Sequence, residues 1–370
     1  MNLFVKYNLK VLAPISVVSF AILFSLYVDR KQRVAGILVC EKPLGERPVL
    51  SGLSEQFAEA TERFERNLAE STTVDDLVVS TVISSFRNSD VSSLETLSEL
   101  SEHNQDNQFA AIQLLNACKE SIHPSCNNEM VNHAIALDGE NGATWALVAG
   151  FRYSNEDAYG ALVALEAAVE APDYDDYFQK GIQLVVNALP TAHDDLAIQM
   201  YINVINHGIT LTVNSYSSLL PVVAMCSENV VENQRLVNAC LSFGRRVEQQ
   251  ASSLLGSGMG HAIESTTYQA LGDVAEVQRR EEEARRTQND RFSGDSRLAS
   301  NLLEYDAQLF RFWLDQLILS GEQAAMESLG EEARRLSSQW NYDPCPNVLF
   351  GNLIFTVADF SRWALSKART

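Results

Sequence analysis

The stretch GATWALVAGFRYSNEDAYGALVALEAAVEAPDYD, residues 142–175, decides the predicted fold. It is 34 residues long, and the preceding 34 residues, 108–141, align with it. Apolar residues recur at matching positions of the two blocks: Leu114 and Val148, Val131 and Leu165, Ala134 and Ala168, and Ala111 and Trp145. A fixed period of this length is typical of repeat proteins, so the sequence predicts stacked helical hairpins.

Residues 142–175 resemble the tetratricopeptide repeat, in which the two helices of a 34-residue unit pack as a hairpin. Trp145, Ala161 and Ala168 stand where the family has its tryptophan and two alanines. Ala149 replaces the family's small glycine, and Leu165 replaces an aromatic residue. Small residues let two helices approach closely, and large residues fill the space between them. The resemblance therefore implies an all-α array of stacked hairpins, a TPR-like α-solenoid.

The second block departs from the family at two positions. Arg152 stands where a tyrosine is usual, and Pro172 comes one place before the closing proline. Residues 108–141 match the family only weakly. Alanine-rich hairpins outside the repeat family are therefore the alternative.

Composition extends the helical prediction to the rest of the 370-residue chain. Glycine, with 18 residues, and proline, with 9, are scarce, so long stretches lack turn signals. We divide the chain into an N-terminal tail, 1–10; a transmembrane anchor, 11–28; a juxtamembrane linker, 29–52; N-terminal helices, 53–107; two TPR-like hairpins, 108–175; further helical hairpins, 176–290; and C-terminal capping helices, 291–370.

An uncharged apolar stretch, Val11–Val28, predicts a membrane-spanning helix near the N-terminus. As a helix it is roughly 27 Å long, which matches the hydrocarbon core of a bilayer. It ends in a charged cluster, residues 29–33, rather than in the small residues of a signal-peptide cleavage site. We therefore expect an uncleaved anchor, with a signal peptide or a buried soluble helix as alternatives.

Six cysteines follow this stretch, and they form three pairs by position: Cys118 and Cys126, Cys226 and Cys240, and the distant Cys40 and Cys345. An even number of cysteines beyond a membrane anchor is typical of an oxidising compartment. Basic residues flank the anchor almost equally on both sides, so they do not fix its orientation. The cysteines favour a cytoplasmic N-terminus and a periplasmic body in a bacterial-type envelope, with a cytoplasmic body as the alternative.

The motif NACKESIHPSC, residues 116–126, allows a disulfide, free thiols or a metal site. Zinc-ligand residue types occur at Cys118, His123, Cys126 and His133. Their spacing is uncommon for zinc, and His133 lies about two helical turns beyond the second cysteine. In the repeat register the two cysteines end one helix and begin the next. This arrangement favours a disulfide across a turn at His123 and Pro124, because the residue before a proline avoids the helix.

Charge and the remaining motifs exclude several classes of function. The formal net charge is −20, and an acidic surface repels phosphate backbones, so we expect no nucleic-acid partner. GSGMGH, residues 256–261, lacks the Lys-Ser/Thr of a phosphate-binding loop and is expected to join two helices. HDD, residues 193–195, is expected to be an exposed helix start, and the charged stretch 272–290 a solvated helix face.

The sequence contains no catalytic motif, and we expect no enzymatic activity, metal site or cofactor. It predicts a membrane-anchored scaffold that binds the membrane through Val11–Val28 and another protein or peptide through the groove of the array. In the repeat register Asn116, Lys119 and Tyr153 face this groove. The alternatives are a hydrolase-like envelope enzyme whose acidic site the sequence does not identify, and a purely structural anchor.

Overall fold

The computed structural model describes residues 31–40, 62–118, 123–188, 219–292 and 294–345, apart from residues 35, 89–90 and 232, and it also describes Tyr216. This part of the chain is helical except for one two-stranded hairpin and the turns, which confirms the prediction of an all-α fold. The chain divides into two compact units. The first contains residues 1–48, 294–310 and 329–370, and the second contains residues 49–293 and 311–328.

The first unit is built on a short antiparallel hairpin. Its elements are β1 (Lys31–Val34), β2 (Ile37–Cys40), α15 (Asp295–Ser300) and the 3₁₀ helix η2 (Asn301–Glu304). Lys31 pairs with Cys40 across the hairpin, and Gly36 in the turn has a left-handed φ of +83°, which glycine adopts without steric cost. Strand β2 packs against α15 and η2. The hairpin occupies part of segment 29–52, for which the sequence predicted only a linker.

Two long-range bonds close the first unit. The Leu38 N–H donates to Ser337 Oγ at 2.9 Å. A disulfide joins Cys40 to Cys345, which are 305 residues apart in the sequence. Both bonds fasten strand β2 to the end of α16 (Ala307–Ser337) and to the segment that follows it.

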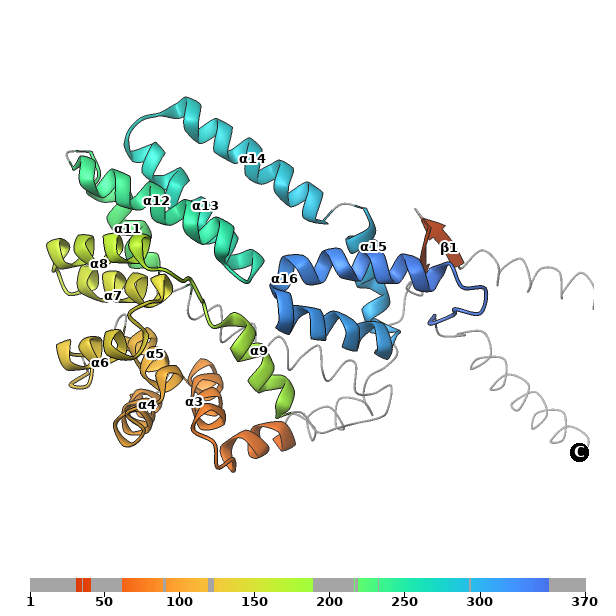
Figure 1. Ribbon diagram of the computed structural model, residues 1–370, viewed down its shortest axis with the longest axis horizontal. Coiled ribbons are helices and arrows are strands. Elements are labelled where there is room, and N and C mark those ends of the chain that lie inside the picture. The colour runs from red at the N-terminus through yellow and green to blue at the C-terminus, as the bar shows by residue number, and fades with distance from the viewer. Residues whose placement is uncertain are drawn as a thin grey trace, which may run out of the picture. The chain divides into compact units, whose positions relative to one another are not determined.

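The second unit consists of helices joined by turns (Figure 1). They are α3 (Val74–Asn88), α4 (Val91–His103), α5 (Gln108–Ala117), α6 (Asn128–Asp138), α7 (Gly142–Ser154), α8 (Ala158–Glu170), α9 (Phe178–Asn187), α11 (Leu220–Glu228), α12 (Gln234–Gln250), α13 (Leu254–Ala270), α14 (Val274–Phe292), a helix over residues 62–69 and the middle of α16. One apolar core extends through this unit, from Phe64 to Ile263 in the sequence.

The two 34-residue blocks form the hairpins α5–α6 and α7–α8. Three of the matched pairs are buried in both blocks: Leu114 and Val148, Val131 and Leu165, and Ala134 and Ala168. The blocks differ in their turns, because α5 and α6 have only 10 and 11 residues, whereas α7 and α8 have 13 each. The two blocks have the same length, but the first hairpin has shorter helices and a longer turn.

Asparagine side chains set the start of both hairpins. Asn107 and Asn141 are 34 positions apart and cap α5 and α7, where they accept from the N–H groups of Ala110 and Ala143. Asn141 also exchanges two hydrogen bonds with Asp175, a further 34 residues along. Its Nδ2 donates to the Asp175 carbonyl oxygen and its Oδ1 accepts from the Asp175 N–H, both at 2.9 Å. Two residues that are one 34-residue period apart in the sequence are thus hydrogen-bonded to each other.

The glycine-rich stretch 256–261 lies inside α13, which corrects the expectation that it joins two helices. Its Gly260 faces Gly244 of α12, and a methyl group on Gly260 would lie 2.5 Å from the Gly244 carbonyl oxygen. Glycine therefore serves close packing here rather than a turn. The helix includes this stretch because Ser253 caps it early, with its Oγ accepting from the Gly256 N–H at 3.0 Å.

Helix α16 is interrupted at Gly321, whose φ of +82° separates two helical arms (Figure 1). Directly after the break, the Glu322 N–H donates to the Ser252 carbonyl oxygen at 2.7 Å. The Glu322 carboxylate accepts from the Leu254 N–H at 2.8 Å. These two bonds hold the break against the start of α13.

Within the described part of the chain, every helix is too short or too polar to span a lipid bilayer. The predicted anchor, Val11–Val28, lies outside the described residues, as does the end of the predicted C-terminal cap, 346–370. The membrane prediction therefore stays a prediction.

Replacing Gly260 with alanine should destabilise the protein, because the new methyl group meets backbone atoms of Gly244 and Glu248. Overpacking of this kind costs about 1–3 kcal/mol. Gly258 is the matched control, since it lies in the same helix and nothing lies within 4 Å of a methyl group there. Alanine at Gly258 should stabilise by about 0.5–1 kcal/mol. Urea unfolding without reductant measures both changes, and effects of the same sign would contradict the close packing of α12 and α13.

Candidate functional site

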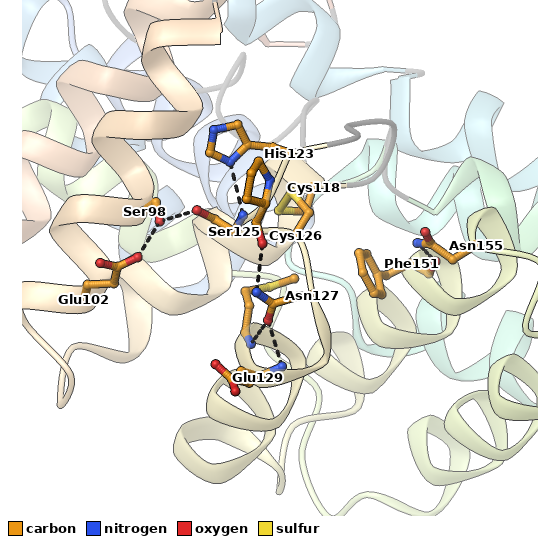
Figure 2. Close-up of a disulfide and its surroundings, with 12 residues drawn as sticks. Ser98, Glu102, Cys118, His123, Ser125, Cys126, Asn127, Glu129, Phe151 and Asn155 are labelled. Carbon is orange, nitrogen blue, oxygen red and sulfur yellow. Dashed lines mark hydrogen bonds between the residues drawn. A yellow bond between two sulfur atoms is a disulfide. The ribbon is translucent and has the colours of Figure 1, made fainter.

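The turn between α5 and α6 is closed by a disulfide between Cys118 and Cys126 (Figure 2). Cys118 is the C-cap of α5. The Cys126 N–H donates to the His123 carbonyl oxygen at 2.9 Å, which makes a tight turn around Pro124. The disulfide and the turn lie where the sequence predicted them.

Neighbouring helices flank this closed turn. Ser98 Oγ of α4 lies 2.7 Å from Ser125 Oγ and 2.9 Å from Glu102 Oε1. Asn127 begins α6, and its Oδ1 accepts from the Glu129 N–H at 2.8 Å. Figure 2 shows these contacts, with the end of α7 on the other side of the disulfide. The turn is therefore held by its own bonds and by α4.

The zinc alternative for this motif needs two thiolates, and the disulfide has already used both sulfur atoms. His123 Nδ1 accepts a hydrogen bond from the Ser125 N–H at 3.3 Å. Among the described residues, no group of three or more His, Cys, Asp or Glu side chains is placed to hold a metal ion. The two cysteines of the motif thus close a structural turn and are not free thiols.

A second disulfide, Cys226–Cys240, closes the turn between α11 and α12, and both cysteines are buried. In the chain-entropy model, closing a loop of about 15 residues stabilises a protein by roughly 3 kcal/mol. Together with Cys40–Cys345, all six cysteines form the three pairs that their positions indicated.

Three hairpin turns of the second unit lie between α5 and α6, α7 and α8, and α11 and α12. Their described residues are 123–127, 155–157 and 229–231, and we call this surface the elbow edge. Helix α7 contacts both α5 and α11. At the end of α7, the Tyr153 hydroxyl donates to Glu228 Oε2 at 3.0 Å and accepts from Asn229 Nδ2 at 2.9 Å. These two bonds join the middle turn to the third.

The middle turn of the elbow edge is exposed and strained. Glu156 has a φ of +63°, in the left-handed region where glycine and asparagine are favoured. Asp157 caps α8 by accepting from the Gly160 N–H at 2.8 Å. Tyr159 is 71% exposed, and Val231 on the third turn is 68% exposed. The elbow edge therefore presents carboxylates beside exposed apolar side chains.

A two-point ion pair joins the helices that follow the middle and third turns. Arg235 of α12 pairs through Nε and Nη2 with both carboxylate oxygens of Glu166 on α8, with Nη2 to Oε2 at 2.5 Å. Burial, and then Glu228, raise the pKa of Tyr153, so its hydroxyl remains protonated and able to donate. The Arg235–Glu166 ion pair and the Tyr153–Glu228 hydrogen bond together fix the relative positions of the middle and third turns.

The structure places the predicted groove residues in different environments. Asn116 is only 1% exposed, on the buried face of α5, so it does not line an open groove, and the prediction is corrected. Tyr153 is half-buried and bonded to the neighbouring turn. Lys119 lies outside the described residues. The exposed Tyr159 was missed, although the short polar turn before it, between two alanine-rich helices, was a visible signal.

A cavity of about 20 Å³ lies beside Tyr174, Asp176, Tyr177 and Tyr216. Its size suits about one water molecule, which is too small for a substrate. Tyr216 donates to Asp176, and Tyr177 donates to Asp138 Oδ2 at 2.9 Å. Burial, and then the nearby aspartates, raise the pKa of both hydroxyls, so they stay protonated donors. This cluster is a hydrogen-bonded part of the core, and its two tyrosine hydroxyls are poorly suited to proton transfer near neutral pH.

A wider hollow of about 240 Å³ lies between residues 62–69 and α3. Its ionisable side chains are Glu65 and Arg66, which carry opposite charges on one helix. The Ser84 hydroxyl donates to the Ser80 carbonyl oxygen at 2.8 Å. Among the described residues that line this hollow, none forms the nucleophile–base pair that covalent catalysis requires.

A buried ion network joins α12, α13 and α14. Arg280 of α14 is 6% exposed, and its Nη2 lies 3.0 Å from Glu264 Oε1 on α13 and also pairs with Glu248 on α12. This burial corrects the expectation that stretch 272–290 is only a solvated face. On α13, His261 Nδ1 is buried and has no hydrogen-bond partner among the described residues.

Residues 193–195, the HDD motif, lie outside the described residues.

Comparison with protein-family models, with curated proteins and with solved structures finds no match to this chain. Its function is therefore inferred from its own geometry.

The stability of the protein should fall as the pH drops through about 6.5, the ordinary pKa of histidine. Burial, and then the charge of Arg280, lower the pKa of His261, against the opposing effects of Glu248, Glu283 and Glu281. The unfolded chain therefore binds this proton more readily than the folded chain, which favours unfolding at low pH.

The measurement is the free energy of unfolding by urea at several pH values for the unchanged chain and for His261→Gln. The unchanged chain should lose more stability than the variant below the ordinary pKa of histidine. His103→Gln is the control, because His103 is an exposed residue at the end of α4. If His261→Gln and the unchanged chain show parallel pH profiles, His261 is not the titrating group.

Proposed function

We propose that this protein is a single-pass membrane protein of a bacterial-type envelope, with a TPR-like α-solenoid body outside the cytoplasm. Its elbow edge binds another protein or peptide, and the chain catalyses no reaction. The elbow edge is the observation that carries this proposal. Two disulfide-closed turns flank an exposed, strained turn, and hydrogen bonds join that turn to its neighbour. A surface held this rigidly loses little conformational entropy on binding.

Contacts between successive hairpins support the solenoid. The α5–α6 hairpin contacts α7, and the α7–α8 hairpin contacts α11 and α12. Contacts of this kind, each hairpin with the next, are typical of repeat arrays. The caps Asn107 and Asn141, at the spacing of the blocks, support the same arrangement.

The disulfides support a body outside the cytoplasm. Three disulfides use all six cysteines, whereas a reducing cytosol keeps thiols free. With the apolar stretch Val11–Val28 as an anchor, the N-terminus then lies in the cytoplasm. A cytoplasmic body is the alternative, and it would require these disulfides to be stable against cellular reductants.

The charge of the elbow edge indicates the chemistry of the partner. Glu156, Asp157 and Glu228 are exposed on it, near Tyr159 and Val231. A basic segment that also carries an apolar side chain complements such a surface. The net charge of −20 would steer a basic partner toward the body and repel nucleic acid.

Catalysis is the less favoured alternative. An enzyme needs a pocket in which ionisable groups converge. The buried cavity has room for about one water molecule, and among the described residues that line the wider hollow the ionisable groups are Glu65 and Arg66. The described geometry therefore favours binding over hydrolysis.

Fractionation of cells tests the anchor and its orientation. We expect the full chain to stay with membranes through an alkaline carbonate wash, and external protease to digest its body in spheroplasts. Without a reductant, a maleimide should modify none of the six cysteines, because all are paired. A chain that washes off, or a body that is protected and becomes alkylated, would contradict the proposed location.

Photocrosslinking in cells tests the elbow edge. A photoreactive amino acid at Tyr159 or Val231 should give discrete adducts, because both side chains are exposed there. Leu255 on α13 is the control site, since it is 45% exposed and lies away from the three turns. Glu156→Lys should reduce the adduct at Tyr159 severalfold, whereas Glu281→Lys on α14 should not. Equal adducts at all three sites would count against a specific surface.

A further inference from the structure

Trp340 is the most exposed large apolar side chain of the described residues, at 94%. It belongs to the first unit, in the turn after α16. That turn is ordered by hydrogen bonds, because the Gln339 N–H donates to the Leu336 carbonyl oxygen at 3.0 Å and the Tyr342 hydroxyl donates to Asp306 Oδ2 at 2.7 Å. The fold therefore holds a large indole out into solvent, where its apolar area is not covered by the described chain.

A disulfide fastens this turn to β2, the second strand of the hairpin. Cys345 lies five residues after Trp340 and is bonded to Cys40, with their Cα atoms 5.4 Å apart. Cys40 is the register partner of Lys31, the first residue of β1. Cα atoms of such partners are about 5 Å apart. The turn that carries Trp340 is thus clamped beside the point where the chain enters the hairpin.

The length of chain before that point is short. Lys31 follows Val28, the last residue of the apolar stretch, by three positions. Even when fully extended, three residues span only about 11 Å. If the apolar stretch crosses a bilayer, Lys31 lies within the lipid headgroup region or just above it. The Cys40–Cys345 disulfide then brings the turn that carries Trp340 close to the lipid headgroups as well.

Charge is consistent with this placement. Between residues 29 and 48 the basic residues Arg30, Lys31, Arg33, Lys42 and Arg47 outnumber the acidic residues Asp29, Glu41 and Glu46. This balance is the reverse of the whole chain, which carries −20. Basic residues beside a membrane anchor are attracted to anionic headgroups, and tryptophan prefers the boundary between headgroups and acyl chains.

We propose that the first unit rests on the bilayer that holds the anchor and that the Trp340 side chain inserts at the level of the lipid headgroups. The inference rests on the proposed membrane anchor. The Cys40–Cys345 disulfide positions the tryptophan, and the excess of basic residues in segment 29–48 of the sequence favours anionic lipid.

The test uses the full chain reconstituted in vesicles of phosphatidylcholine and phosphatidylglycerol, with or without bromine atoms on the acyl chains. One variant keeps Trp340 alone, through Trp145→Phe, Trp313→Phe and Trp363→Phe. The matched control keeps Trp145 alone, which lies on α7 in the second unit and donates to the Gly139 carbonyl oxygen at 2.7 Å. Brominated lipid should quench the Trp340 emission, because an indole at the membrane interface lies within reach of the acyl chains, and should leave the Trp145 emission unchanged.

Flotation with the vesicles after an alkaline wash distinguishes a failure of the proposed anchor from a failure of the inference about Trp340. A chain that does not float would overturn the anchor, and with it the basis of the inference. If the chain floats but bromine leaves Trp340 as bright as Trp145, the anchor stands and the inference alone is wrong. Trp340→Phe in the otherwise unchanged chain is the second measurement, and it should reduce quenching by bromine more than Trp145→Phe does.

Discussion

The paired hydrogen bonds between Asn141 and Asp175 are the constraint on which the arrangement of the hairpins depends. One amide caps α7 and also holds the backbone 34 residues further along, so the end of the second block is fastened to the residue directly before its start. Because Asn107 caps α5 at the same spacing, the first helices of both blocks begin at corresponding points. The two hairpins therefore start in the same register, although α5 ends after 10 residues and α7 after 13.

The two disulfides of the second unit close the two outer turns of the elbow edge. Cys118–Cys126 closes its first turn and Cys226–Cys240 its third, while the middle turn depends on Tyr153 and its bonds to the third turn. Closing a loop stabilises mainly by restricting the unfolded chain. The two closed turns and the Tyr153 bonds together leave the elbow edge little backbone freedom to lose on binding. A partner that contacts the middle turn would have few other backbone segments to order.

The sequence predicted what depends on local pattern and missed what depends on tertiary partners. Alanine-rich periodicity was sufficient for the helices. The positions of the six cysteines suggested three pairs but did not fix the connectivity, because six cysteines allow 15 pairings. Gly260 was assigned to a junction because glycine is ambiguous until its partner, Gly244, is known. Asn116 was placed in a groove by the repeat register, and Arg280 on a solvated face by the charges around it. Both are buried, and Arg280 pairs with Glu248 and Glu264. Tyr159 was missed because helix-to-helix packing decides which turns face solvent.

The strain at Glu156 bears on the proposed role of the elbow edge. A left-handed non-glycine residue costs of order 1 kcal/mol, which glycine at the same position would avoid. The two closed turns and the Tyr153 bonds are sufficient to hold the chain in that conformation, so the fold tolerates the strain without needing it for stability. What glutamate adds over glycine is an exposed carboxylate, beside Asp157 and close to the exposed ring of Tyr159. A residue that weakens its own turn while adding charge to a rigid surface is better explained by binding than by folding.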